Sequence, residues 1–147
     1  MTEIAKELFA VHNGEDCRFE LRLWINKIKF NRAQLDTFQR YLEKIVKHFG
    51  DIEMMAEVER YQNKFIVYRD VADKLVKDLK SLRNKLADIS PKDSSAIESK
   101  AIIKEEKEKH IKRSQAFLNI VEELKESFIY FYTSNYISEN HIPASKN

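Results

Sequence analysis

The sequence contains very few of the residues that make tight turns. Its 147 residues include two glycines and two prolines. The favoured hairpin turns of β-sheets need glycine, asparagine or aspartate at positive φ, so a chain this poor in glycine is a weak candidate for a sheet protein. Lys, Glu, Leu, Ile and Ala, by contrast, are abundant, and most of them favour helices. The composition therefore predicts an all-α protein.

The chain also lacks the signals of a secreted or membrane protein. Its single cysteine, Cys17, cannot form a disulfide within the chain. The opening residues, MTEIAKELFAVHNGED, carry acids where a secretory signal has a basic end and a long apolar stretch. The densest apolar patch, FIYFY, is far too short to span a bilayer. We therefore expect a cytoplasmic protein that does not interact with membranes.

Charges of one sign are not concentrated in any long segment. The formal net charge is +2, and basic and acidic residues are equal in number in residues 51–89 and again in residues 94–135. A nucleic-acid-binding protein normally gathers its cations on one face, so this pattern disfavours nucleic acid as a partner. Nucleic-acid binding remains an alternative because the first long segment has a surplus of cations: Arg18, Arg22, Lys27, Lys29 and Arg32.

Apolar residues recur at a 3,4 spacing along three segments, which is the pattern of amphipathic helices packed side by side. The first segment covers about residues 14–49, between a plausible N-cap at Asn13 and a stop at Gly50. The second follows the break at Gly50 and ends near Ile89. A capping box of Ser95 and Glu98 should begin the third, which extends to about residue 135.

Short connections make consecutive helices neighbours, so these segments should fold back on one another. We predict one domain over residues 1–147, an antiparallel up-down-up bundle of three long helices. Residues 1–13 should form a short N-terminal helix or arm, and residues 136–147 a flexible tail.

The first apolar stripe is interrupted by Asn31, where leucine would be expected. Counting outward from the two turns brings Asn31 level with Tyr68 and with Ser114 or Phe117. An unmatched buried asparagine costs about 1–3 kcal/mol, so a buried polar layer of Asn31, Tyr68 and Ser114 would fix the register of the helices. A polar pocket for a ligand is the alternative interpretation.

The sequence carries none of the common arrangements of catalytic or metal-binding residues. A di-iron bundle needs glutamate three residues before histidine, and none of the four histidines has it. Motifs for phosphate-cradling loops, zinc sites and activated nucleophiles are also missing. We therefore predict no catalytic residue, no metal site, no cofactor and no small-molecule substrate.

The segment EKHIKRSQAF is similar to the histidine phosphotransfer domains, which are four-helix bundles with an exposed helical histidine followed by basic and small residues. Here His110 is followed by Arg113, Ser114 and Ala116. The segment departs from the family at Lys112, where an apolar residue is usual, and it lacks the family's glycine. The resemblance implies that His110 would be the phosphoacceptor.

Some apolar residues lie off the predicted core stripes and are candidates for an interface. On the first helix these are Phe19, Leu23 and Phe30, and on the third the apolar run around the helix includes Ile129, Tyr130 and Tyr132. Aligned apolar residues outside a core suggest association. We therefore expect a homodimer or another protein partner.

The runs LRLWINKIKFNRAQLDTFQRYLEKIV and MAEVERYQNKFIVYRDVADKL resemble a family of short cytosolic helical proteins of Bacteroidetes-type bacteria. The resemblance covers about the first two helices, and it brings no activity, cofactor or partner. It implies a stand-alone helical domain. Together these patterns predict a non-catalytic helical interaction or scaffold module that self-associates.

Overall fold

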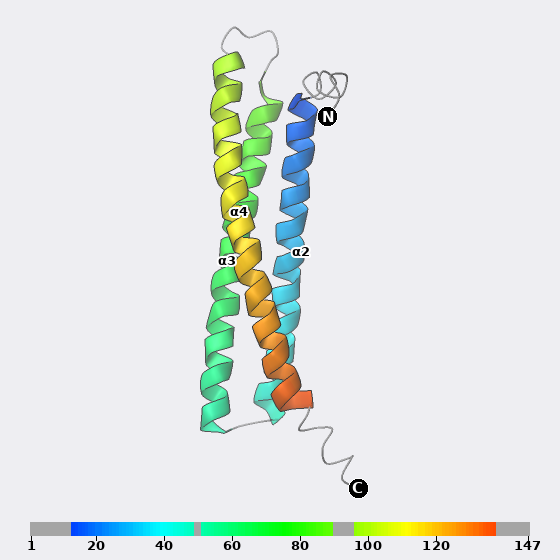
Figure 1. Ribbon diagram of the computed structural model, residues 1–147, viewed down its shortest axis with the longest axis vertical. Coiled ribbons are helices and arrows are strands. Elements are labelled where there is room, and N and C mark those ends of the chain that lie inside the picture. The colour runs from blue at the N-terminus through cyan, green and yellow to red at the C-terminus, as the bar shows by residue number, and fades with distance from the viewer. Residues whose placement is uncertain (1–12, 49–50, 90–95, 138–147) are drawn as a thin grey trace. The chain divides into compact units, whose positions relative to one another are not determined.

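The computed structural model of the chain describes residues 13–48, 51–89 and 96–137. They form three long helices, α2 (Asn13–His48), α3 (Ile52–Ala87) and α4 (Ala96–Tyr132), and a π-helical turn, η1 (Thr133–Ile137) (Figure 1). The three helices pack against each other, and the described residues contain no strand. The prediction of an all-α protein is confirmed.

The helix boundaries lie within a few residues of the predicted ones. α3 begins at Ile52 because the Asp51 carboxylate caps it, with Oδ1 accepting a hydrogen bond from the Met54 backbone N–H at 2.6 Å. α4 ends at Tyr132 rather than near residue 135. Residues 136 and 137, predicted as tail, belong to η1. Of the helix or arm predicted over residues 1–13, Asn13 belongs to α2 and residues 1–12 lie outside the described residues, as do residues 138–147 of the predicted tail.

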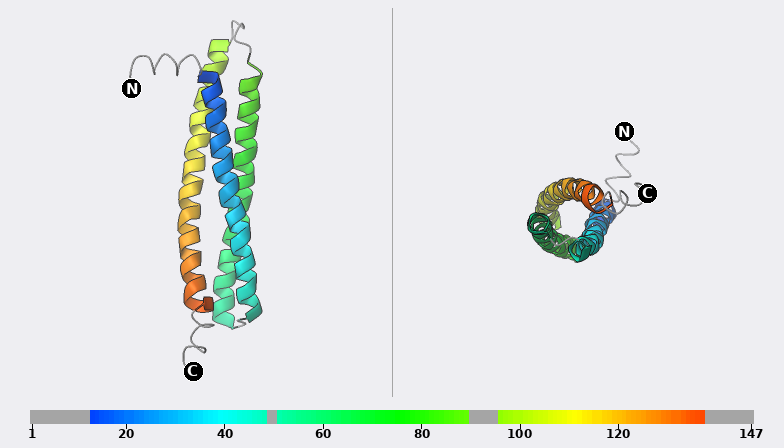
Figure 2. Two further views of the ribbon diagram at one scale, coloured as in Figure 1. Left: turned by 90° about the vertical axis from the view of Figure 1, so that its right-hand side faces the viewer. Right: turned by 90° about the horizontal axis from the view of Figure 1, so that it is seen from below.

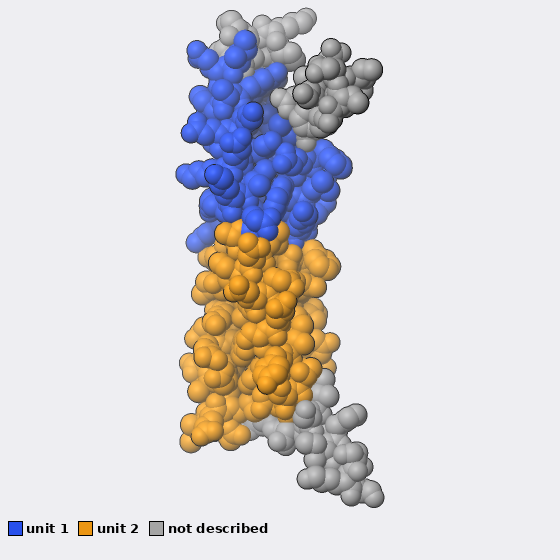
Figure 3. All heavy atoms as spheres, viewed as in Figure 1, with its two compact units in different colours: residues 1–29, 73–115 blue, residues 30–72, 116–147 orange. Residues whose placement is uncertain are grey.

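The chain divides into two compact units, coloured separately in Figure 3. Unit 1 contains residues 1–29 and 73–115, and unit 2 contains residues 30–72 and 116–147. Each unit therefore takes one segment from α2, one from α3 and one from α4. Figure 2 shows the three helices from two further sides.

The core of unit 1 is aliphatic. α2 and α3 contribute branched apolar side chains that are almost fully buried, and α4 adds one further isoleucine: Leu21, Ile25, Ile28, Leu75, Leu79, Leu82 and Ile103. Burial of a leucine or isoleucine side chain stabilises the fold by about 1.5–3 kcal/mol, so this cluster is enough to hold the three segments together.

The core of unit 2 combines aliphatic side chains with a cluster of aromatic rings. Phe128 of α4 lies at its centre, with its ring centroid 5.2 Å from those of Phe38 and Phe65 and 5.4 Å from that of Tyr61. The Tyr61 hydroxyl reaches out of this cluster and forms a hydrogen bond of 2.6 Å with Ser127 Oγ. The aromatic residues pack edge to face or tilted, the arrangements that aromatic pairs prefer.

One residue of the predicted core stripe of α2 is replaced by its neighbour. The 3,4 spacing from Leu21 selects Trp24, but the structure buries Ile25 and leaves Trp24 half-buried. Both choices satisfy helical periodicity, because a step of three or of four residues returns to the same face. Trp24 instead lies at the edge of the core with the Lys27 ammonium 4.7 Å from its ring centroid.

Candidate functional site

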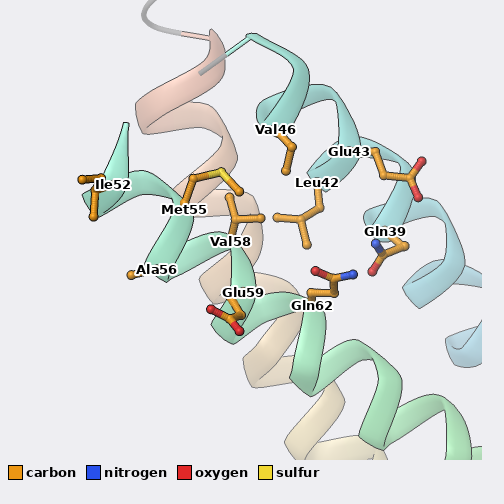
Figure 4. Close-up of a pocket in the computed structure, with 10 residues that line it drawn as sticks. All are labelled: Gln39, Leu42, Glu43, Val46, Ile52, Met55, Ala56, Val58, Glu59 and Gln62. Carbon is orange, nitrogen blue, oxygen red and sulfur yellow. The ribbon is translucent and has the colours of Figure 1, made fainter. Parts of the chain in front are cut away.

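Unit 2 contains an open groove between α2 and α3, with a volume of about 690 Å³ (Figure 4). Leu42 and Val58 form its buried floor. Three further apolar side chains along it are exposed, Val46 by 42%, Met55 by 37% and Ile52 by 89%. Figure 4 shows Val46 and Met55 approaching each other across the gap between the two helices. The groove is thus an apolar surface that the described residues leave open to solvent.

Polar groups border this groove. The amide ends of Gln39 and Gln62 face each other beyond Leu42, and Glu43 and Glu59 lie on opposite sides (Figure 4). Gln39 Oε1 is buried and has no hydrogen-bond partner among the described residues. A buried acceptor left unpaired costs about 1–3 kcal/mol, which a hydrogen-bond donor entering the groove would recover. Neither glutamate has an ion pair in the described part of the chain.

Asn31 forms a hydrogen bond with α4 that the sequence pattern does not predict. Its Oδ1 accepts a hydrogen bond of 2.9 Å from the Lys125 ammonium of α4, which also donates to Gln34 Oε1 at 2.6 Å and pairs with Glu122 at 3.1 Å. The Lys125 side chain is only 12% exposed. Asn31 is therefore an acceptor for a largely buried cation, and sequence spacing could not reveal this because the lysine lies in a distant segment of the chain.

The predicted buried polar layer draws on both units, Asn31 and Tyr68 on unit 2 and Ser114 on unit 1, so as a whole it stays a prediction. Asn31 and Tyr68 are half-buried, and their predicted burial is wrong. Tyr68 turns toward α4, where it lines a pocket of about 260 Å³ with Leu124 and Ser127. Ser114 is fully buried as predicted, but it belongs to unit 1 and donates its hydrogen bond to the His110 carbonyl of its own helix at 2.8 Å.

Most residues predicted as an interface are exposed. In unit 1 Phe19 is 59% and Leu23 is 45% exposed. In unit 2 the exposed members are Phe30 (62%), Ile129 (50%) and Tyr130 (76%). Tyr132 differs, because it is half-buried and stacks on Tyr41 with a centroid distance of 5.1 Å.

His110 is half-buried in unit 1, and Arg113 lies close to it. The Arg113 guanidinium is 3.2 Å from His110 Nδ1 and 3.2 Å from the Asp78 carboxylate. Arg113 thus contacts one ring nitrogen of His110. A phosphoryl group on His110 would also attract this guanidinium. Phosphotransfer through His110 stays a prediction.

Cys17 lies beside a lysine in unit 1. Lys107 Nζ is 3.7 Å from the Cys17 sulfur and 2.9 Å from the Glu20 carboxylate. Burial acts to lower the pKa of the Lys107 ammonium, but the hydrogen bond to Glu20 and the nearby Cys17 sulfur outweigh it, so the pKa of Lys107 is raised. The cluster ties α2 to α4 within this unit.

The described residues contain no group of three histidine, cysteine, aspartate or glutamate side chains that could hold a metal ion. Among the described helices, none is both long and apolar enough to cross a membrane. Comparison of the chain with protein-family models, with curated proteins and with solved structures gives no match. The resemblance to short helical Bacteroidetes proteins therefore stays a prediction.

Proposed function

We propose that this chain is a non-catalytic helical interaction module of the cytoplasm, and that the groove between α2 and α3 in unit 2 is where it binds another protein. The observation that carries the proposal is the open apolar groove with a buried, unpaired acceptor at Gln39. Apolar grooves of this kind accept the apolar face of an amphipathic helix. Basic residues beside that face would pair with Glu43 and Glu59.

A second copy of the chain is the occupant we propose. Val46, Ile52 and Met55 expose apolar surface along the groove, and a second copy that docks groove against groove would remove both sets from water. Contiguous exposed apolar residues on helices are a common mark of association. Self-association also explains why a chain with a formed core keeps residues such as Met55 and Val46 exposed.

The proposal includes the up-down-up arrangement of the helices, and contacts within unit 2 support it. In unit 2, Asp36 of α2 pairs with Arg69 of α3, and the later residue Val46 lies near the earlier residue Met55, as expected for antiparallel helices. Between α2 and α4, later residues of one helix contact later residues of the other. Within unit 2, Asn31 of α2 accepts a hydrogen bond from Lys125 of α4, and the later residue Tyr41 packs on the later residue Tyr132, as expected for parallel helices.

Light scattering coupled to size exclusion tests the association. We expect the wild-type chain to have the mass of a dimer, and Met55→Glu to have the mass of a monomer with unchanged helical circular dichroism. The matched control is Ile102→Glu, which changes an exposed apolar residue of unit 1 and should leave the dimer intact. A wild-type chain that is monomeric at every concentration would contradict self-association.

A second variant separates the two candidate surfaces of unit 2. Tyr130 is exposed on α4 and does not line the groove. If the groove is the contact, Tyr130→Glu should leave the dimer at its wild-type mass. Dissociation by Tyr130→Glu together with an intact Met55→Glu dimer would reject the groove and assign the contact to α4.

A further inference from the structure

Unit 1 has a second groove between α2 and α3, of about 430 Å³, with a different character. It is lined by three guanidinium groups, one aromatic ring, one amide and one methyl group: Arg18, Arg22, Arg83, Phe19, Asn84 and Ala87. Arg18 and Arg22 lie one helical turn apart on α2, an axial separation of roughly 6 Å. Arg83 approaches from α3.

The cations of this groove differ from the other interhelical cations of the unit. Lys107 pairs with Glu20, Arg113 with Asp78, and Lys85 with Glu106, so ion pairs join α4 to α2 and to α3. None of Arg18, Arg22 and Arg83 has an ion-pair partner among the described residues. Ion pairs therefore neutralise these three cations beside α4, whereas the three arginines of the groove have no counter-charge bound to them in the described part of the chain.

Two further lysines of unit 1 repel each other. The pKa of Lys80 on α3 is lowered, mainly by the Lys29 ammonium of α2, with repulsion from Arg83 of the groove adding to the effect. Like charges at short range destabilise the fold unless a counter-charge intervenes. A bound anion would supply that charge.

We propose that this groove binds single-stranded nucleic acid, with the arginines on phosphates and Phe19 stacked on a base. The planar fork of arginine fits phosphate oxygens in pairs. Phe19 is 59% exposed in the same pocket, where its ring is open to a base. A cationic groove combined with an exposed aromatic ring is the arrangement that holds single strands without sequence readout. The Asn84 amide adds a group that can donate to and accept from a base or sugar.

Fluorescence anisotropy with a labelled oligouridine RNA of about a dozen nucleotides tests the proposal, a length typical of one single-strand site. The test variant is Arg18→Gln/Arg22→Gln/Arg83→Gln. The matched control, which removes three positive charges from unit 2, is Arg40→Gln/Lys47→Gln/Lys64→Gln. We expect the slope of log K against log salt to fall by about 2 for the groove variant, at roughly 0.7 per phosphate contact, and to change little for the control.

Phe19 provides a second, independent measurement. Phe19→Ala should weaken binding about tenfold through lost stacking while leaving the salt slope unchanged. Leu23→Ala is its control, since Leu23 is also exposed on α2 but does not line the groove. Oligomeric mass and circular dichroism, measured for each variant in the same buffer, separate loss of binding from loss of association or folding.

Three results would overturn the proposal. The first is no binding of the wild-type chain to the RNA at about 50 mM salt, where electrostatic binding is strong. The second is an equal loss of affinity in the groove and control variants. The third is binding to vesicles of anionic phospholipid without binding to the RNA, which would assign the groove to a membrane surface instead.

Discussion

At the scale of single residues, Lys125 shows how a buried cation fixes the side chains around it. Its ammonium group donates hydrogen bonds to the side-chain amide oxygens of Asn31 and Gln34 and forms an ion pair with the Glu122 carboxylate. Removing an ion from water costs several kcal/mol, and only well-placed acceptors compensate for it. The asparagine in the apolar stripe of α2 is thus explained by a partner on α4, within the same unit.

A double-mutant cycle measures this interaction. Asn31→Leu and Lys125→Met should each lower the free energy of unfolding by about 1–3 kcal/mol, because each leaves polar partners unsatisfied. The double variant should lose less than the sum of the two, with a coupling of about 1 kcal/mol in urea titrations. Asn26→Leu, at an exposed position of α2, serves as control and should change stability by less than about 0.5 kcal/mol. Additive losses would show that the contact contributes no stability.

The raised pKa of Lys107 predicts a dependence of stability on alkaline pH. A raised pKa means that the folded state binds the proton more tightly, so the stabilisation is complete below the ordinary lysine pKa of 10.5 and is lost as pH rises through the higher folded value. We expect Lys107→Met to be less stable than wild type by about 1 kcal/mol at neutral pH, and this gap to narrow above pH 10.5. Urea titrations across the alkaline range give the gap, and a gap independent of pH would contradict this assignment.

At the scale of helices, boundaries depend on short-range groups. Asp51 satisfies the Met54 N–H at the start of α3. At the end of α4, the Thr133 hydroxyl and the Asn135 amide donate to backbone carbonyls of the preceding turn, where the chain changes from α- to π-helix. The predicted helix ends lie close to the observed ones because capping depends on residues near each end in the sequence. No sequence signal predicts η1.

Removing the cap of α3 should destabilise the protein measurably. We expect Asp51→Ala to lower the free energy of unfolding by about 1 kcal/mol, since a backbone donor loses its acceptor at the helix start. Glu53→Ala, which changes an acid in the same turn without a capping bond, should cost less than half as much. Thermal and urea unfolding compare the two, and equal losses would assign the effect to charge alone.

At the scale of the whole molecule, the two units differ in core chemistry. The buried core described for unit 1 is leucine and isoleucine, whereas unit 2 adds to its aliphatic residues a cluster of phenylalanine and tyrosine rings around Phe128. They also differ in charge. Basic residues outnumber acidic ones nearly two to one among the described side chains of unit 1, and acidic residues prevail in unit 2. Basic and acidic residues that alternate along the sequence are thus distributed unequally between the two units after folding.

The aromatic core makes a strong prediction for Phe128. Phe128→Ala should lower the free energy of unfolding by about 3–5 kcal/mol, because it opens a large cavity among Phe38, Tyr61 and Phe65. The adjacent Ile129 is 50% exposed, so Ile129→Ala should cost under about 1 kcal/mol. Urea unfolding measures both, and a comparable loss for the two would contradict the burial described for α4.

The sequence alone determined that the protein is helical, where its three helices lie, and most of the core residues, because periodicity and capping act over a few neighbouring residues. Only the tertiary structure decided that Ile25 is buried in place of Trp24, and that Asn31 contacts Lys125. It also brought Arg83 of α3 beside Arg18 of α2. Each of these depends on which helix faces lie opposite each other, and contacts between residues far apart in the chain leave no periodic trace in the sequence.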